Sequence, residues 1–339
     1  MSQNHSDPDL LDVRDLTIAL PIDGVLTDVV RGVDLSVSRG EILGIVGESG
    51  SGKSLTARAL MRLAPEGAQL GGAVFFNGND VLGLNKAGLR AVRSGGMAMV
   101  YQDPRASINP VVSCGAQVRE ILRVGRGFDS TRARAEVLRL LELVSIRDPE
   151  RVARAFPMEL SGGMLQRVLI AMALASAPEL MIADEATTSL DVTVQAEIVA
   201  ILAELRREQG LGMIFITHDL ELAAVICDRI AVMYAGRIVE QQHAAGLFED
   251  PRHPYTVQLL AARPHVTHRQ TRLAAIPGRP PALAALPAGC PFHPRCSKTT
   301  ELCATAEPPV CTLAPGAYAR CHYAVASTQP YAATDKAVS

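Results

Sequence analysis

Apolar and polar residues alternate through the first part of the chain, which predicts β-strands there. Between residues 11 and 43, stretches such as VRDLTIAL and VVRGVDLSV are punctuated by Gly and Asp. A period of two is typical of half-buried strands. Residues 71–78 and 97–101 predict two further strands. We therefore expect this part of the chain to be rich in β-sheet.

The middle of the chain changes to helical periodicity. From about residue 113 to 175 the apolar spacing is helical, most clearly in EVLRLLELV, and predicts an inserted helical subdomain at about residues 105–175. Apolar runs return at residues 180–183 and 213–216, as expected of buried strands in a parallel sheet. We expect a helix over residues 192–209 between them. Asp191 is placed to cap its start and Gly210 to end it.

The last part of the chain has a different composition. The stretch RIAVMYAGRIVE predicts a hairpin that turns at Ala235-Gly236. Beyond Asp250, Pro, Ala and Arg become frequent, and residues 276–296 contain too many prolines for a regular element. We therefore predict two domains, residues 1–250 and residues 251–339.

Length and charge narrow the classes of function. With 339 residues, 48% of them apolar, the chain can bury a full core and form an enzyme. Its net charge of −2 indicates no nucleic-acid partner. No apolar stretch reaches the roughly 18 residues of a membrane span, and the polar start MSQNHSDPDL does not resemble a secretory signal. We expect a cytoplasmic protein that meets the membrane through other proteins.

A phosphate-binding loop lies between a predicted strand and a predicted helix. It fits the pattern G-x-x-x-x-G-K-[ST] in full, and Leu55 follows it. Its residues are Gly47, Glu48, Ser49, Gly50, Ser51, Gly52, Lys53 and Ser54. The glycines allow successive N–H groups to point at phosphate oxygens, while Lys53 would neutralise them and Ser54 would bind Mg²⁺. The loop predicts a nucleoside triphosphate site.

A pair of carboxylates follows the apolar run at residues 180–183. Asp184 and Glu185 would lie at the carboxyl end of a parallel strand, where α/β sheets bind ligands. One carboxylate can support Mg²⁺ while the other polarises an attacking water. Alone, such a pair would be an ordinary solvated strand end. Its position downstream of a phosphate loop favours the catalytic interpretation.

The order of the motifs resembles the nucleotide-binding subunit of ABC transporters over roughly residues 10–245. After the phosphate loop come Gln102, Leu160-Ser161-Gly162-Gly163, Asp184-Glu185, Ser189-Leu190-Asp191 and His218. The resemblance implies an α/β P-loop NTPase core of the RecA-like type. To this core it adds an N-terminal antiparallel β subdomain, the inserted helical subdomain, and a small irregular cysteine-rich C-terminal extension.

The resemblance also assigns roles to single residues. Gln102 would sense Mg²⁺ and water, Asp184 would support Mg²⁺, Glu185 would be the general base, and His218 would contact the γ-phosphate. Asp191 lies in the loop that crosses to a second subunit. The signature residues Ser161, Gly162 and Gly163 would contact ATP held by that subunit, so a lone copy should bind ATP yet hydrolyse it poorly.

Two positions depart from the family pattern. Met164 replaces the usual Gln of the signature, although the contacts expected of Ser161 and Gly163 do not need that side chain. Leu20 stands where many members have an adenine-stacking aromatic residue. Stacking worth about 1 kcal/mol would then become plain apolar contact. We expect weaker or less adenine-selective nucleotide binding.

Two further stretches resemble the ATPases of oligopeptide, dipeptide and nickel importers. They are residues 101–110, YQDPRASINP, and residues 251–256, PRHPYT. This resemblance implies the ATP-hydrolysing subunit of a di- or oligopeptide importer on the cytoplasmic face of the bacterial inner membrane. Its partners would be a second, homologous ATPase in a heterodimer, two transmembrane permeases and an extracytoplasmic peptide-binding protein. A nickel or other small-solute importer is the alternative within the class.

Other classes of function predict features that this sequence lacks. A soluble ABC ATPase acting on DNA or ribosomes would show paired cassettes or a long coiled coil, whereas the chain has one phosphate loop and one signature. A regulatory nucleotide-binding module would be supported by loss of Glu185 or His218, and both are present.

Five cysteines crowd into the tail. In the peptide-importer ATPases the spacing of Cys290, Cys296, Cys303 and Cys321 is associated with a 4Fe-4S cluster. Four thiolates also suit Zn²⁺. The absence of C-x₂-C pairs favours an iron–sulfur cluster over zinc. A tail whose cysteines bind no metal is the remaining alternative. Cys311 falls outside the pattern and is expected to be a spare thiol.

Overall fold

The fold is organised around one large mixed sheet. The computed structural model describes residues 9–187, 191–262 and 276–324. The eight strands lie in the order β11-β12-β10-β9-β3-β8-β7-β6. Five of them, from β9 to β6, run parallel, and β10 and β12 continue the sheet in antiparallel fashion. The strands are β3 (Ile42–Val46), β6 (Met97–Val100), β7 (Leu180–Asp184), β8 (Gly212–Thr217), β9 (Arg229–Tyr234), β10 (Arg237–His243), β11 (Val310–Ala314) and β12 (Ala317–Arg320).

The apolar runs of the sequence form the centre of this sheet. Every residue of β3, β7 and β8 is buried, as expected where helices cover both faces of a parallel sheet. The carboxyl ends of these three strands therefore meet at one edge, each followed by a loop that carries polar residues. This edge positions the candidate site.

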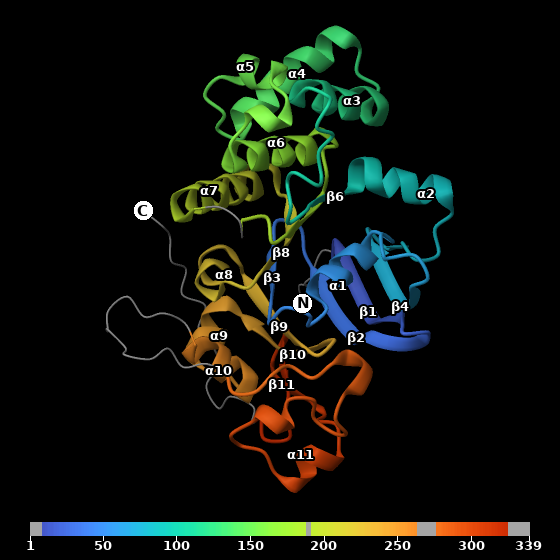
Figure 1. The fold of residues 1–339 in the computed structure, drawn as a ribbon, viewed down its shortest axis with the longest axis vertical. Helices are drawn as coiled ribbons and strands as arrows, with labels where there is room; N and C mark the ends of the chain where they lie inside the picture. Colours follow the sequence, from blue (N-terminus) through green and yellow to red (C-terminus); the bar gives the residue numbers. More distant parts are fainter. Residues whose placement is uncertain (1–8, 188–190, 263–275, 325–339) are drawn as a thin grey trace, which may run out of the picture.

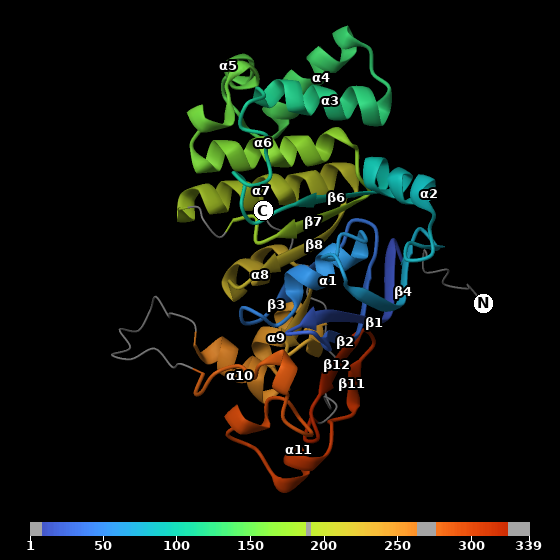
Figure 2. The ribbon, with the colours of Figure 1, turned by 45° about the vertical axis from the view of Figure 1, so that its right-hand side comes forward.

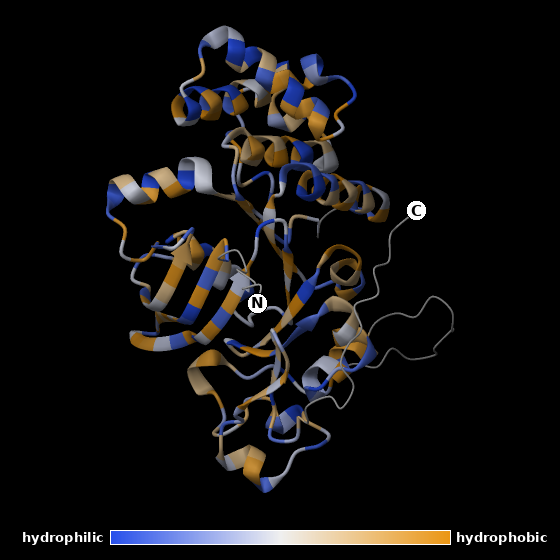
Figure 3. Ribbon diagram, turned by 180° about the vertical axis from the view of Figure 1, so that it is seen from behind, coloured by the Kyte–Doolittle hydropathy of each residue, from blue (hydrophilic) through white to orange (hydrophobic). Residues whose placement is uncertain are grey.

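A second, antiparallel sheet packs beside the core. Its four strands have the order β2-β1-β4-β5, and Figure 3 shows hydrophobic and hydrophilic residues alternating along them. Their bounds are β1 (Leu11–Ile22), β2 (Val25–Val37), β4 (Gln69–Phe76) and β5 (Asn79–Asp80). The predicted N-terminal antiparallel subdomain is confirmed.

The helical subdomain stands at one end of the molecule (Figures 1 and 2). There α3, α4, α5 and α6 pack on one another, and α6 also contacts β6. Because α6 lies between the subdomain and the sheet, most of its residues are buried. The helices are α1 (Lys53–Leu60), α2 (Lys86–Ala91), α3 (Cys114–Arg126), α4 (Ser130–Leu143), α5 (Pro149–Arg154), α6 (Gly162–Ala175), α7 (Val192–Gln209), α8 (Leu220–Ile226), α9 (Ala244–Glu249), α10 (Pro254–Ala261) and α11 (Glu301–Thr305).

Local signals in the sequence placed several boundaries correctly. The Asp191 carboxylate accepts a hydrogen bond from the Val194 N–H at the start of α7, and Gly210 ends that helix with φ 62°. The β9–β10 hairpin turns at Ala235-Gly236, where both φ angles are positive. Within the described residues no helix is long and apolar enough to cross a membrane.

The tail contains more regular structure than its composition indicates. Residues 276–296 form only the 3₁₀ turns η3 (Leu283–Ala285) and η4 (His293–Arg295), as their prolines predict. Beyond them, however, β11 and β12 form a hairpin around Pro315-Gly316, a strong turn signal. Strand β12 pairs with β10, so the tail extends the core sheet. The domain division at residue 250 stays a prediction.

A buried carboxylate on β10 docks the start of the tail. Glu240 is fully buried and accepts hydrogen bonds from the backbone N–H groups of Arg252, at 2.7 Å, and His253, at 2.9 Å. Burial raises the pKa of Glu240. His253, itself 1% exposed, accepts a hydrogen bond from the Tyr255 N–H through Nδ1. The hydrogen bond from the Tyr255 N–H needs a neutral imidazole, because a protonated Nδ1 cannot accept.

We predict that acid loosens this junction. Burial lowers the pKa of His253 from its ordinary 6.5 to about 4. Between these values the unfolded chain binds the proton at His253 and the folded chain does not, so the contribution of His253 to stability falls as pH drops below about 6.5. By pH 5 the loss should be on the order of 2 kcal/mol. Urea denaturation between pH 7.5 and 5 measures it.

The matched control is His253→Gln, which cannot titrate in this range. Between pH 7.5 and 5, this variant should lose less unfolding free energy than the unsubstituted chain does. The difference should equal the loss on the order of 2 kcal/mol attributed to His253. Identical pH dependence in the two proteins would contradict the role given to His253.

Candidate functional site

The phosphate loop joins β3 to α1 and is shaped by close packing against β9. A Cβ at Gly47 would lie 2.2 Å from the carbonyl oxygen of Met233, and one at Gly52 would lie 2.8 Å from that residue's Cε. Both glycines also have positive φ angles, 152° and 107°. Only glycine therefore fits these positions, and the loop curls around the space at the N-terminus of α1.

Lys53 and Ser54 begin α1 and face the edge of the sheet. The Lys53 ammonium donates to the carbonyl oxygens of Gly47, at 2.8 Å, and Glu48, at 3.0 Å. Its side chain is buried, and burial lowers its pKa. Phosphate oxygens would supply stronger acceptors for the same ammonium group than these neutral carbonyls.

The strand-end carboxylates lie beside the loop. The Ser54 hydroxyl donates to Asp184 Oδ1 at 2.7 Å. Asp184 is 2% exposed, and burial raises the pKa of its carboxyl group. These two oxygens converge on one point, and a set of hydroxyl and carboxylate oxygens is what Mg²⁺ prefers. The residues present therefore fit a magnesium ion.

Glu185 connects three loops. Gln102, which follows β6, donates through Nε2 to Glu185 Oε2 at 2.8 Å. Nδ1 of His218, which follows β8, lies 3.7 Å from the same oxygen. The Asp219 carboxylate caps α8 by accepting hydrogen bonds from the backbone N–H groups of Glu221 and Leu222. This cap holds the backbone of the neighbouring His218 at the end of β8. The structure thus brings together the three residues predicted to be catalytic.

These residues surround a cavity of about 560 Å³, a volume ordinary for ligand sites. Its walls include polar residues of the loop and of the strand ends, and four apolar side chains. The lining residues are Leu20, Val29, Ser49, Gly50, Gly52, Lys53, Ser54, Leu55, Gln102, Glu185, His218 and Leu283. Of these, Val29 and Leu283 were missed from the sequence, because neither belongs to a motif.

The signature lies apart from this cavity. Ser161 caps the N-terminus of α6, accepting a hydrogen bond from the Met164 N–H. Ser161, Gly162, Gly163 and Asp191 are absent from the cavity's lining. A Cβ at Gly163 would lie 2.6 Å from Val194 of α7, which explains glycine there. Ser189 and Leu190 lie outside the described residues.

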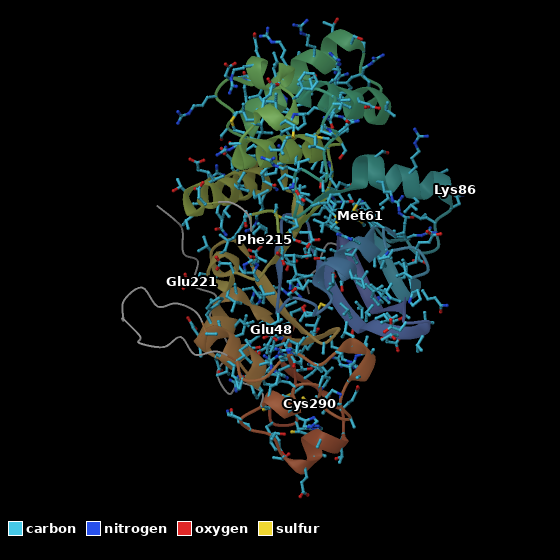
Figure 4. The ribbon with its side chains drawn as sticks, viewed as in Figure 1. Glu48, Met61, Lys86, Phe215, Glu221 and Cys290 are labelled. Atoms are coloured by element: carbon cyan, nitrogen blue, oxygen red, sulfur yellow. The ribbon has the colours of Figure 1, made fainter. Side chains whose placement is uncertain are left out.

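The side chain of Glu48, in the phosphate loop, turns toward the tail. Arg295 binds its carboxylate with two nitrogens, at 2.7 and 2.9 Å, and the Tyr255 hydroxyl accepts from its backbone N–H at 2.9 Å. Figure 4 shows Glu48 beside the tail segment that carries Cys290. Tyr234, Tyr255 and Phe292 pack ring against ring around this contact. The tail therefore holds the phosphate loop directly.

Four of the tail cysteines line a second, small cavity of about 60 Å³. They are Cys290, Cys296, Cys303 and Cys321, the four that the spacing predicted. Cys311 does not line this cavity, and its thiol donates to the Ala324 carbonyl at 3.2 Å.

Backbone amides point at three of the four sulfurs. The N–H groups of Lys298, Phe292 and Tyr323 donate to Cys296, Cys290 and Cys321 respectively. Burial raises the pKa of Cys290 to about 11. In the described part of the chain no group of three or more His, Cys, Asp or Glu residues is placed to hold a metal ion.

Comparison with known proteins decides the family. Residues 30–188 match the family model described as ABC transporter, and residues 239–303 match oligopeptide/dipeptide transporter, C-terminal region. The chain is 46% identical to the oligopeptide transport ATP-binding protein OppD of Salmonella typhimurium over 92% of its length and 93% of the relative's. This chain belongs to the ABC transporter ATP-binding proteins.

Other comparisons agree with this membership. The dipeptide transport ATP-binding protein DppD of Escherichia coli is 41% identical over 93% of this chain and 96% of its own. The dimeric bacterial ABC transporter cassette MJ0796 covers 69% of this chain and 98% of its own, with 26% identity and a TM-score of 0.63. As an ABC ATP-binding subunit, the chain is an ATPase, and the predicted P-loop NTPase fold is confirmed.

We predict that the Arg295–Glu48 ion pair contributes to the stability of this ABC subunit. The Arg295 side chain is 4% exposed and that of Glu48 25%. Arg295→Ala should lower the free energy of unfolding by about 2 kcal/mol, because it leaves a half-buried carboxylate without its partner. Urea denaturation of the two single variants and the double variant gives the coupling energy.

Arg279→Ala is the matched control, since it removes an exposed arginine from the same segment. It should leave the unfolding free energy unchanged. If the double variant loses as much unfolding free energy as the two single variants lose in sum, Arg295 and Glu48 are not coupled, and the prediction is contradicted.

Proposed function

We propose that this chain hydrolyses ATP to drive an importer of di- or oligopeptides. The main support for an ATPase site is that Gln102 and His218 both contact the Glu185 carboxylate. All three residues line the cavity that also contains residues of the phosphate loop. The match of the tail to the oligopeptide/dipeptide transporter region supports peptides as the cargo. An importer of nickel or another small solute is the alternative, because other chains of such a transporter select the solute.

The side chains divide the work of phosphoryl transfer. Lys53 would donate to phosphate oxygens, and Ser54, Asp184 and Gln102 would hold Mg²⁺, which neutralises charge on the phosphates when bound. Glu185 would accept a proton from the attacking water. Gln102 orients this carboxylate through its hydrogen bond, and His218 is placed to contact the terminal phosphate. Positioning and charge stabilisation supply most of such a reaction.

The position of the signature supports a partner cassette. Ser161 and the first N–H groups of α6 form a helix N-terminus, which favours anions, but they do not line this chain's own nucleotide cavity. We infer that they contact ATP bound to a second, homologous ATPase, and that Lys53 and Glu185 receive that subunit's signature in turn. ATP would then close the heterodimer and hydrolysis would release it.

A groove on the helical subdomain suits a permease segment. It holds about 430 Å³ between α3, α4 and α5 and combines arginines with apolar residues. Phe156, 45% exposed, lies at its wall. An amphipathic cytoplasmic helix with acidic residues would match this surface. We propose that the partners of this chain are two transmembrane permeases and an extracytoplasmic peptide-binding protein, and that the chain acts at the cytoplasmic face of the bacterial inner membrane.

We also propose that the four cavity-lining cysteines hold a 4Fe-4S cluster. Four cysteines that line one small cavity match the number of thiolates that usually hold such a cluster. The amide donors to Cys290, Cys296 and Cys321 would stabilise thiolates and tune the potential of a cluster.

The catalytic assignment predicts that Glu185→Gln separates binding from turnover. In the assembled transporter this variant should bind ATP with unchanged affinity and lose hydrolysis by about 10²-fold or more, because no carboxylate accepts the proton from water. Phosphate release measures the rate, and equilibrium binding of radiolabelled ATP measures the affinity. Glu204→Gln, an exposed substitution on α7, is the control. Undiminished hydrolysis by Glu185→Gln would exclude Glu185 as the base.

The cluster assignment predicts iron and acid-labile sulfide in anaerobically purified protein, with a broad visible absorption band. Cys303→Ser should lose both, whereas Cys311→Ser should retain them because Cys311 lies outside the cavity. Metal analysis that found zinc in place of iron would support the zinc alternative. Protein that contained neither metal would contradict the site.

A further inference from the structure

The nucleotide cavity is lined by two chemically different sets of side chains. Lys53, Gln102 and Glu185 are polar or charged, whereas Leu20, Val29 and Leu283 are among the apolar lining residues. In the ATP site proposed above, the phosphates bind at the phosphate loop. The remaining part of a bound nucleotide, its ribose and base, must then extend along the rest of the cavity, where flat apolar base surface meets apolar side chains.

Leu283 comes from the tail rather than from the cassette core. It begins the 3₁₀ turn η3, which packs against β2 of the antiparallel sheet. The side chain is half-buried and contacts the hydrophobic clusters on both sides of the core. It is therefore held at the cavity wall by packing on two sides.

Arg295 fixes the segment that carries Leu283. Besides binding Glu48 of the phosphate loop, it donates through Nε to the Pro277 carbonyl at 2.9 Å. The residues from Pro277 to Arg295 thus form a loop closed on itself and tied to the phosphate loop. This geometry holds Leu283 at the wall of the cavity that the phosphate loop also lines.

We propose that Leu283 contacts the base of the nucleotide and completes, with Leu20 and Val29, the surface on which the base lies. The proposal rests on the ATP site proposed above. It makes the tail a part of that site. It also accounts for the aliphatic Leu20 at its position, because a second leucine from the tail supplies apolar contact there.

The test compares a ligand that has a base with one that has none. In the full-length protein, Leu283→Ala should weaken binding of Mg-ADP about fivefold and leave binding of inorganic tripolyphosphate unchanged. Leu283→Phe should tighten Mg-ADP binding about threefold by stacking, again without an effect on tripolyphosphate. Competition against a fluorescent nucleotide measures both ligands.

Leu286→Ala is the matched control. Leu286 ends the turn η3 and packs against the hydrophobic core, but it does not line the cavity. It should leave the affinity for both ligands unchanged. Equal weakening of Mg-ADP and tripolyphosphate by Leu283→Ala, or an unchanged ratio of the two affinities in both Leu283 variants, would overturn the proposal. Failure of the unsubstituted protein to bind either ligand would instead refute the ATP site itself.

Discussion

The close packing of the phosphate loop against β9 is the constraint on which the site depends. At Gly47 the neighbouring Met233 carbonyl leaves no room for a Cβ, so the loop can only curl inward. That curl sets Lys53 and Ser54 at the start of α1, opposite the carboxyl ends of β7 and β8. Asp184, Glu185 and His218 reach the same space because parallel strands end at one edge. A change in the loop would therefore displace the cation site and the phosphate site together.

The tail takes part in this arrangement from the opposite side. Arg295 and Tyr255 bind Glu48, one through its carboxylate and the other through its backbone, while Leu283 reaches the cavity wall. Of the four cavity-lining cysteines, Cys290 and Cys296 flank the turn η4 that carries Arg295. Arg295 thus links the segment of two cavity-lining cysteines to the phosphate loop. This ion pair of low exposure resists rearrangement, because breaking it leaves a charge unpaired.

Much of the fold followed from local pattern. Buried apolar runs predicted the parallel strands, and Asp191 with Gly210 predicted the ends of α7, because capping and turn preferences are local properties of the backbone. Proline content correctly predicted that residues 276–296 form no long helix or strand. The C-terminal extension, expected to be irregular, nevertheless contains a hairpin that turns at Pro315-Gly316, and its strand β12 pairs with β10, a partner distant in sequence.

The sequence by itself determined the phosphate loop, the strand-end carboxylates and the family, since each depends on residue types at fixed short spacing. Tertiary structure alone decided that Glu48 faces Arg295 rather than the nucleotide cavity, that Leu283 lines that cavity, and that the signature lies away from it. These outcomes depend on contacts between segments separated by up to hundreds of residues. No local spacing encodes such contacts, because they are set by how strands pair and which faces must be buried.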